Sequence, residues 1–280
     1  MAEEIPFKGD GLKGKEIKDG ASETRLPPKQ AVRECIQVDM PTARGPAGQV
    51  RAVIFDLDET LIDSVQGHVG AHAEVCRVLG EFLRGKGISV DEKEVLTQIS
   101  KLDDEMNKQF IYDRNEWWPR LLQRMTVQTS LPQELVERLT RSYWLAYASS
   151  AKPYTETLPV LKYLRDRGYL LGLLSDTDRL PGMKRYRIEI QPFKDLFHIT
   201  LVSGEDTKQT KPSPEPFLAA AEKLGVRPEE CVFVGDKPFA DIEGAKKAGM
   251  KTVLVYRRDW GVKVEADYVI RSLDELRHIL

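Results

Sequence analysis

The sequence predicts an α/β protein: a Rossmann-like parallel sheet core with helices on both faces, plus a helical unit inserted after the first strand. Two observations carry this prediction. From residue 153 onward, short apolar runs alternate with segments of helical periodicity, which is the order of a parallel sheet built from strand–helix–strand units. Between residues 65 and 150, helical periodicity continues without a convincing strand. This stretch therefore indicates a separate helical unit.

The first part of the chain differs from the rest. Residues 1–49 are polar and interrupted by Gly and Pro, a composition that favours a poorly ordered extension. A short strand from Val32 to Val38 is the one element that we expect there. The first strand of the sheet then begins at Arg51, where the sequence turns apolar through Leu57.

The inserted unit is expected to contain four helices, because apolar residues recur every three to four positions. Breaks at Gly85-Lys-Gly87 and Ser130-Leu-Pro132 separate them. The helices are expected at roughly 66–85, 91–110, 115–126 and 132–149.

Downstream, Gly168 is a C-terminal stop for one helix, and runs such as Cys231-Val-Phe-Val234 are apolar at every position. A strand that is covered on both faces has this composition. The expected strands cover 169–174, 199–202, 231–234 and 251–255. The expected helices cover 158–167, 180–189, 214–224 and 239–248. A final strand and helix are expected within 268–280.

Composition narrows the class of partner. Lys and Arg number 42 against 44 Asp and Glu, for a net charge of -2, so no overall field attracts nucleic acid or an anionic membrane. Residues 1–20 lack the apolar core of a signal peptide, and no apolar stretch approaches about 18 residues. Three widely spaced cysteines fit a reducing compartment. We expect a cytoplasmic protein with a small-molecule partner and neither a nucleic acid nor a membrane partner; the sequence leaves its oligomeric state open.

Two carboxylates, Asp56 and Asp58, follow the first apolar run. In an extended segment, side chains two residues apart point the same way. Two like charges this close repel unless a cation, a proton or hydrogen-bond donors stabilise them. The pattern favours a metal site or acid–base chemistry, and its plain alternative is an acidic turn at the end of a strand.

Three further places carry polar groups close after expected strands or before helices: Ser175, Lys211, and Gly235-Asp236 together with Asp241. Ligands of an open α/β sheet bind beyond the carboxyl ends of its strands. Taken alone, Ser175 could be a helix N-cap and Lys211 a solvated surface charge. As a set, these residues suit a phosphate.

With these residues in this order along the sequence, the chain resembles the haloacid dehalogenase superfamily of phosphohydrolases. The four motifs of that superfamily correspond here to Asp56-Leu-Asp-Glu-Thr60, Ser175, Lys211 and Gly235-Asp-Lys-Pro-Phe-Ala-Asp241. The resemblance spans residues 51 to about 258, and the inserted helices resemble the cap domain of that superfamily. It implies an α/β core of residues 50–64 and 152–280 and a helical cap of residues 65–151, with hinges near 62–66 and 150–154.

The resemblance also implies roles. Asp56 would be the nucleophile that forms an aspartyl-phosphate, and Asp58 would protonate the leaving alcohol and later accept a proton from the attacking water. Ser175 and Lys211 would hold phosphate oxygens.

Magnesium is the implied cofactor, held by Asp56, Asp236 and the backbone carbonyl of Asp58. Asp241 would either orient the metal shell or complement a helix dipole. Two residues depart from the family pattern: Asp176 stands where a neutral amide is frequent, and Lys237 adds a cation directly after Asp236.

The expected function is magnesium-dependent hydrolysis of a small phosphorylated metabolite. A phosphomutase, which differs only in the acceptor of the phosphoryl group, stays an alternative. So do a carbon–halogen hydrolase, against which Asp58 argues, and a non-catalytic phosphate-binding or signalling module. Candidate substrate contacts in the cap are Tyr112, Arg114, Trp117 and Trp118, although packing is the stronger interpretation for the paired tryptophans.

Overall fold

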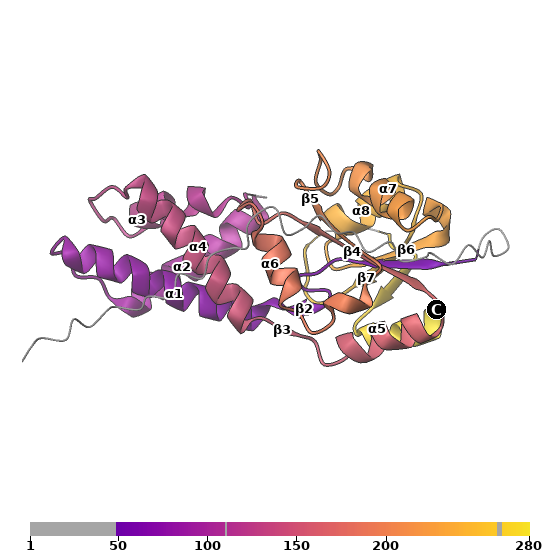
Figure 1. Ribbon diagram of the computed structural model, residues 1–280. Helices are drawn as coiled ribbons and strands as arrows, with labels where there is room; N and C mark the ends of the chain where they lie inside the picture. The colour runs from indigo at the N-terminus through magenta and orange to yellow at the C-terminus, as the bar shows by residue number, and fades with distance from the viewer. Residues whose placement is uncertain (1–48, 110, 262–264) are drawn as a thin grey trace, which may run out of the picture. The chain divides into compact units, whose positions relative to one another are not determined.

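The computed structural model describes residues 49–109, 111–261 and 265–280, and it confirms the predicted α/β architecture. Six strands form one parallel sheet in the order β5-β4-β1-β6-β7-β8 (Figure 1). The strands are β1 (Ala52–Phe55), β4 (Leu170–Asp176), β5 (Ile199–Ser203), β6 (Cys231–Gly235), β7 (Lys251–Val255) and β8 (Tyr268–Ile270). The predicted extension up to residue 48 and its strand at Val32–Val38 lie outside the described residues.

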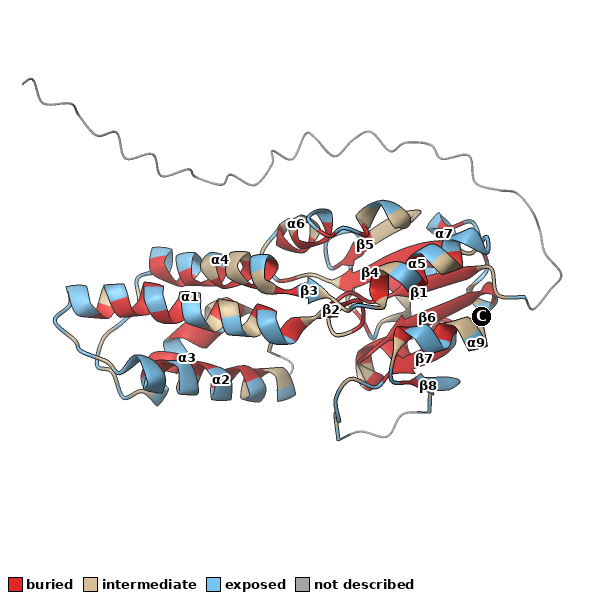
Figure 2. Cartoon of the chain, turned by 90° about the horizontal axis from the view of Figure 1, so that it is seen from below, coloured by how far each residue is buried: buried red, intermediate tan, exposed pale blue. Residues whose placement is uncertain are grey.

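Helices cover both faces of this sheet (Figures 1 and 2). The helices of the core are α5 (Thr157–Asp166), α6 (Met183–Glu189), α7 (Pro214–Lys223), α8 (Glu243–Lys247) and α9 (Leu276–Ile279). Ile54 of β1 belongs to an apolar cluster with Phe217 of α7, whereas its neighbour Phe55 belongs to a second cluster with Leu161 of α5. Successive side chains of a strand point to opposite faces, so a strand that is apolar at every position packs against helices on both sides.

The segment between β2 (Ile62–Asp63) and β3 (Lys152–Pro153) is helical, as expected. Its helices are α1 (Ser64–Gly85), α2 (Glu92–Lys108), α3 (Trp117–Arg124) and α4 (Gln133–Ser150), and the short 3-10 helix η2 (Arg114–Glu116) leads into α3. We call residues 64–150 the helical insertion. Strands β2 and β3 pair antiparallel at its base, so the chain enters and leaves the insertion side by side.

Several element boundaries differ from the sequence-based expectation; the helix expected at 239–248, for example, is α8 only from Glu243. Two further differences concern β4 and α6. Strand β4 runs to Asp176 rather than ending at Leu174, because Ser175 and Asp176 still pair with Val202 and Ser203 of β5. Ser175 therefore lies within a strand, not after one. Helix α6 begins at Met183 and not near Leu180. Gly182 has a φ of 77°, a left-handed conformation through which an α-helix cannot continue.

Among the described residues, no helix combines the length and the apolar character needed to cross a membrane.

Close packing between α7 and α8 depends on Gly244. A Cβ at this position would lie 2.4 Å from Cε2 of Phe217 and 3.2 Å from Cα of Pro212. Phe217 cannot retreat freely, because it is fully buried and packs edge-on against Phe233 of β6 at a centroid distance of 4.8 Å. The absence of a side chain at Gly244 therefore sets the distance between the two helices.

We predict that Gly244→Ala lowers the thermal unfolding midpoint, because overpacking a filled core typically costs about 1–3 kcal/mol. Gly85→Ala is the matched control: it also lies in a helix, nothing is within 4 Å of its added Cβ, and alanine favours a helix more than glycine does. The control should leave the midpoint unchanged or raise it. An equally stable Gly244→Ala variant would contradict this view of the α7–α8 contact.

Candidate active site

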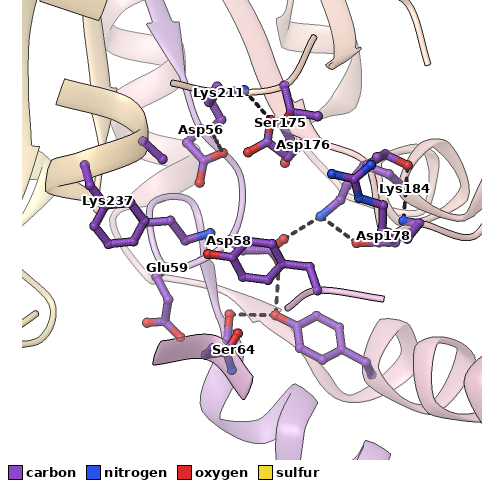
Figure 3. A pocket seen from close by; sticks show the side chains of 18 of the residues that line it. Asp56, Asp58, Glu59, Ser64, Ser175, Asp176, Asp178, Lys184, Lys211 and Lys237 are labelled. Carbon is purple, nitrogen blue, oxygen red and sulfur yellow. Dashed lines mark hydrogen bonds and ion pairs between the residues drawn. The ribbon is translucent and has the colours of Figure 1, made fainter. Parts of the chain in front are cut away.

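A cavity of about 350 Å³ opens where the strands β1 and β4 end. Predicted site residues Asp56, Asp58, Ser175 and Lys211 line it, as does Lys237 (Figure 3). The helical insertion supplies further lining residues, which are Ser64, His68, Asn107, Tyr112, Arg114, Trp144 and Tyr147. The cavity thus joins the carboxyl end of the sheet to the insertion, as expected for a ligand site of an α/β fold.

Sheet order brings two of the predicted residues together. Strands β1 and β6 are hydrogen-bonded neighbours, and the backbone N–H of Asp56 donates to the carbonyl of Val234 at 2.9 Å. Asp56 and Asp236 therefore follow adjacent strand ends. Together with Asp241, they form a group in which one carboxylate oxygen of each residue lies within 4.8 Å of the other two.

This carboxylate cluster, Asp56, Asp236 and Asp241, is almost completely buried, with exposures of 2%, 1% and 0%. Burial raises the pKa of Asp236 well above its ordinary value; the charge of Lys237 opposes this shift, and the carboxylates of Asp241 and Asp56 add to it. Burial also raises the pKa of Asp56, against the opposing charge of Lys211. Both shifts reflect negative charge held away from water without enough compensation.

Three oxygens of the cluster have no hydrogen-bond partner: Oδ2 of Asp56 and both carboxylate oxygens of Asp236. Buried polar atoms are nearly always paired in folded proteins. Unpaired carboxylate oxygens from neighbouring strand ends are a donor set that suits a hard divalent cation such as Mg²⁺, which prefers oxygen ligands.

Lys211 supplies positive charge at one side of the cluster. Its Nζ donates to Oδ1 of Asp56 and to Oδ1 of Asp241, both at 2.6 Å. Burial lowers the pKa of Lys211, but Asp241 and Asp56 outweigh it and raise the pKa well above its ordinary value. Lys211 is therefore a buried ammonium ion and not the solvated surface charge that was its alternative.

Asp241 uses both of its oxygens within the protein. Oδ1 accepts from Lys211, and Oδ2 accepts from the backbone N–H of Lys237 at 2.9 Å. The side chain of Asp241 can lie this close to the end of β6 only because residue 235 is glycine: a Cβ there would lie 2.4 Å from Oδ2 of Asp241. Asp241 thus contacts Lys211 directly, a partner that neither sequence-based interpretation named.

Asp176, one of the two departures from the family pattern, has defined partners. It accepts hydrogen bonds from the hydroxyl of Ser203 and, at 3.1 Å, from the backbone N–H of Lys211. A carboxylate at this position holds the loop that carries Lys211. The second departure, Lys237, is half-buried, and its Nζ lies 5.9 Å from the ring centroid of Tyr112.

Asp58 lines the same cavity, but its carboxylate belongs to a different group of charges. Its Oδ2 accepts from Nζ of Lys184 at 2.6 Å, and its Oδ1 accepts from Arg187. Burial raises the pKa of Asp58, but Arg187 and Lys184 outweigh burial and hold the pKa well below its ordinary value. The hydroxyl of Tyr147, on α4, lies 3.0 Å from Oδ1, so the helical insertion contacts Asp58 directly.

Sequence reasoning missed the partners of Asp58. Lys184 and Arg187 lie one turn apart on α6, and Asp178 contacts both, with its Oδ1 2.8 Å from each. All three side chains are at most 4% exposed. The signal in the sequence was a pair of cations at i and i+3, nine and twelve residues after Ser175, a spacing that places them on one helix face.

The candidate substrate contacts in the insertion divide into two kinds. Trp117 and Trp118 are fully buried, and their ring N–H groups donate to the carbonyl of Ile111 at 3.0 Å and to the hydroxyl of Thr140 at 2.8 Å. They are packing residues. Tyr112 and Arg114 line the cavity.

Comparison with known proteins finds one hydrolase family and several phosphatases. The model of the haloacid dehalogenase-like hydrolase family matches residues 50–249. The chain is 31% identical over 235 residues to a glyceraldehyde 3-phosphate phosphatase of Methanopyrus kandleri, covering 82% of this chain and 96% of that protein. It is 30% identical over 242 residues to a phosphoglycolate phosphatase of Escherichia coli, covering 81% and 91%.

Among solved structures, the chain is similar to a phosphatase of the same family from Thermococcus onnurineus. The TM-score is 0.56 and the sequence identity 30%, with 82% of this chain and 97% of that chain covered.

We predict that Arg187→Met destabilises the protein strongly, because removal of one partner from a buried ion pair costs about 3–5 kcal/mol. Asp178 and Asp58 would each lose a donor. Urea unfolding at neutral pH measures the change. Lys194→Met is the matched control, since Lys194 makes an exposed ion pair with Glu189, and exposed pairs contribute little. Equal stability of the two variants would show that the buried charges are not interdependent.

Proposed function

The chain belongs to the haloacid dehalogenase-like hydrolase family, and we propose that it is a magnesium-dependent phosphatase that hydrolyses a small phosphomonoester through an aspartyl-phosphate. Both named relatives above are phosphatases of small phosphorylated metabolites. The predictions of the family and of a hydrolase of the phosphoric monoester phosphatase type are confirmed at this level. The substrate class, the ion, the intermediate and the residue roles are the content of our proposal.

The proposal rests on the different surroundings of the two carboxylate oxygens of Asp56. Lys211 holds its Oδ1, while its Oδ2 has no partner and lies in the carboxylate cluster at the cavity. An ionised carboxylate attacks phosphorus without prior deprotonation. Lys211 fixes the orientation of the carboxylate at the cavity, where one oxygen can attack while the other binds the ion.

In the first step, an oxygen of Asp56 forms a bond to phosphorus, and the bond between phosphorus and the leaving oxygen breaks. The electron pair stays on that oxygen, which takes a proton from Asp58. In the second step, water attacks the phosphoryl group on Asp56 while Asp58 accepts a proton from the water. Inorganic phosphate leaves, and Asp56 is restored as a carboxylate.

The surroundings of Asp58 favour the second of these steps. Lys184 and Arg187 hold its pKa well below the ordinary value, after burial has raised it, so Asp58 is ionised in this arrangement and ready to accept a proton. Proton donation in the first step requires a higher pKa. We expect the phosphate of the substrate to draw Lys184, which lines the cavity, away from Asp58.

Mg²⁺ fits the unpaired oxygens of Asp56 and Asp236, with the backbone carbonyl of Asp58 as a third protein ligand. When bound, the ion supplies positive charge that shields the attacking carboxylate from the phosphate. Ser175 and Lys211 line the cavity beside Asp56, where a hydroxyl and an ammonium group hold phosphate oxygens.

The proposed division into a core of residues 50–64 and 152–280 and a cap of residues 65–151 gives the insertion a role. It covers the cavity and excludes water from the reacting groups. A carbon–halogen hydrolase of the same family would release halide and need no proton donor, so the network built around Asp58 favours the phosphatase. We place the enzyme in the cytoplasm, acting on a soluble metabolite.

We predict that purified protein releases inorganic phosphate from members of a panel of small phosphomonoesters, and that EDTA abolishes the release until Mg²⁺ is restored. Asp56→Asn should abolish turnover, because an amide is not a nucleophile for phosphorus. Asp166→Asn, which changes an exposed carboxylate on α5, is the control and should keep full activity. Turnover by the Asp56→Asn variant would refute the proposed nucleophile.

A second prediction concerns proton transfer. Asp58→Asn should lower kcat by about 10² to 10⁴, the usual contribution of a positioned acid or base. Thermal unfolding of the same sample checks that the variant is folded. Near-normal kcat in folded Asp58→Asn protein would mean that Asp58 is a structural carboxylate only.

A further inference from the structure

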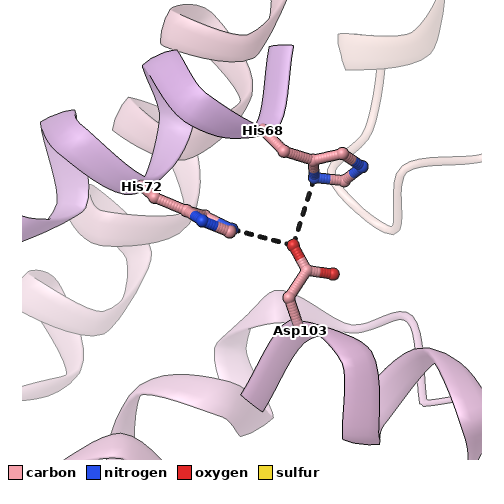
Figure 4. Close-up of side chains that lie close together, drawn as sticks. All are labelled: His68, His72 and Asp103. Carbon is pink, nitrogen blue, oxygen red and sulfur yellow. Dashed lines mark hydrogen bonds and ion pairs between the residues drawn. The ribbon is translucent and has the colours of Figure 1, made fainter. Parts of the chain in front are cut away.

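A second group of metal-ligating side chains lies in the helical insertion, apart from the carboxylate cluster. His68 and His72 lie one turn apart on α1, and Asp103 faces them from α2 (Figure 4). Nε2 of His72 is 2.8 Å from Oδ2 of Asp103, and Nδ1 of His68 is 3.1 Å from the same oxygen. Three donor atoms from two helices therefore converge on one point.

The spacing of these atoms is close to that of a metal site. All three lie within 4.8 Å of one another. Ligands at about 2.0–2.1 Å from a tetrahedral ion are separated by roughly 3.3 Å. The two separations to Oδ2 of Asp103 are only a few tenths of an ångström shorter, so small side-chain rotations would admit an ion between the donors.

The neighbours of Asp103 orient it for such a role. Its other oxygen, Oδ1, accepts a hydrogen bond from the side-chain amide of Asn107, which leaves Oδ2 directed at the histidines. Metal-ligating carboxylates are held by outer hydrogen bonds of the kind that Asn107 makes. The hydroxyl of Tyr143 lies 3.0 Å from Nδ1 of His68, the nitrogen that faces Asp103, so a bound ion would replace this contact.

Access and burial also suit an ion. The side chain of Asp103 is 8% exposed and that of His72 13%, whereas that of His68 is 34% exposed. His68 and Asn107 line the cavity of the candidate active site. An ion can reach the group from the cavity, while the remaining ligands are shielded from water.

We propose that His68, His72 and Asp103 form a binding site for a divalent transition-metal ion, with Zn²⁺ as the reference ion. Two imidazole nitrogens and one carboxylate oxygen match the ligands of Zn²⁺ and its neighbours in the first row, whereas Mg²⁺ prefers oxygen ligands alone. The bound ion fastens α1 to α2 at the wall of the cavity. This site is independent of the proposed phosphatase chemistry.

The test is a calorimetric titration of the full chain with Zn²⁺ in excess Mg²⁺, which saturates the carboxylate cluster. We expect one equivalent of Zn²⁺ to bind. His72→Gln and Asp103→Asn should weaken binding by about 10- to 100-fold or more, since loss of an outer partner alone has this effect in known sites. His278→Gln, which changes an exposed histidine on α9, should bind as the wild type does.

Asp236→Asn separates the two metal sites, because it removes a carboxylate from the cluster and leaves the histidines intact. Zn²⁺ binding should persist in this variant. Loss of binding in Asp236→Asn with retention in His72→Gln would place Zn²⁺ at the carboxylate cluster and overturn the proposal, as would no binding by the wild type.

Should His72→Gln fail to fold, the visible absorption of Co²⁺ bound to the wild type decides. Nitrogen ligation in a four- or five-coordinate site gives intense bands that Zn²⁺ removes by competition. Only weak absorption, typical of octahedral oxygen ligation, would refute the histidine site.

Discussion

The structure depends on one constraint, which is the excess of negative charge in the buried carboxylate cluster. Asp56, Asp236 and Asp241 are buried, with one carboxylate oxygen of each within 4.8 Å of the other two, and Lys211 is a buried cation that contacts two of them. Lys237 also places its charge near Asp236 and Asp56, but two ammonium groups still do not balance three carboxylates, and a buried charge without compensation is costly. The sheet order imposes the crowding, because β1 and β6 are neighbours and Asp56 and Asp236 directly follow their ends. In our account, a divalent cation balances this charge.

A second charge group beside it is balanced internally. Asp58 and Asp178 face Lys184 and Arg187, two negative charges against two positive ones. This group needs no ion, and Tyr147 ties it to the helical insertion. The two groups differ in charge balance although they share a cavity. In our account, the unbalanced group holds the metal and the nucleophile, and the balanced group holds the proton-transfer residue and sets its charge state.

The sequence predicted those features that depend on local pattern and strand order. Apolar runs located the strands, and the rule that ligands bind beyond strand ends brought Asp56 and Asp236 to one site. Contacts that depend on the packing of separate helices were not predictable. The convergence of Lys184 and Arg187 on Asp58 requires the position of α6, and the meeting of His68 with Asp103 requires the packing of α1 on α2. Ser175 was placed after its strand because a polar residue ends the apolar run, although its backbone continues the sheet.

The most direct test of the charge imbalance is anomalous diffraction from a crystal of the protein soaked with Mn²⁺, which takes the same oxygen ligands as Mg²⁺. Our account predicts a peak in contact with Oδ2 of Asp56 and with the carboxylate of Asp236, the atoms that have no partner in the protein. A well-ordered cavity without a peak between these two residues, at a Mn²⁺ concentration that saturates other sites, would contradict it.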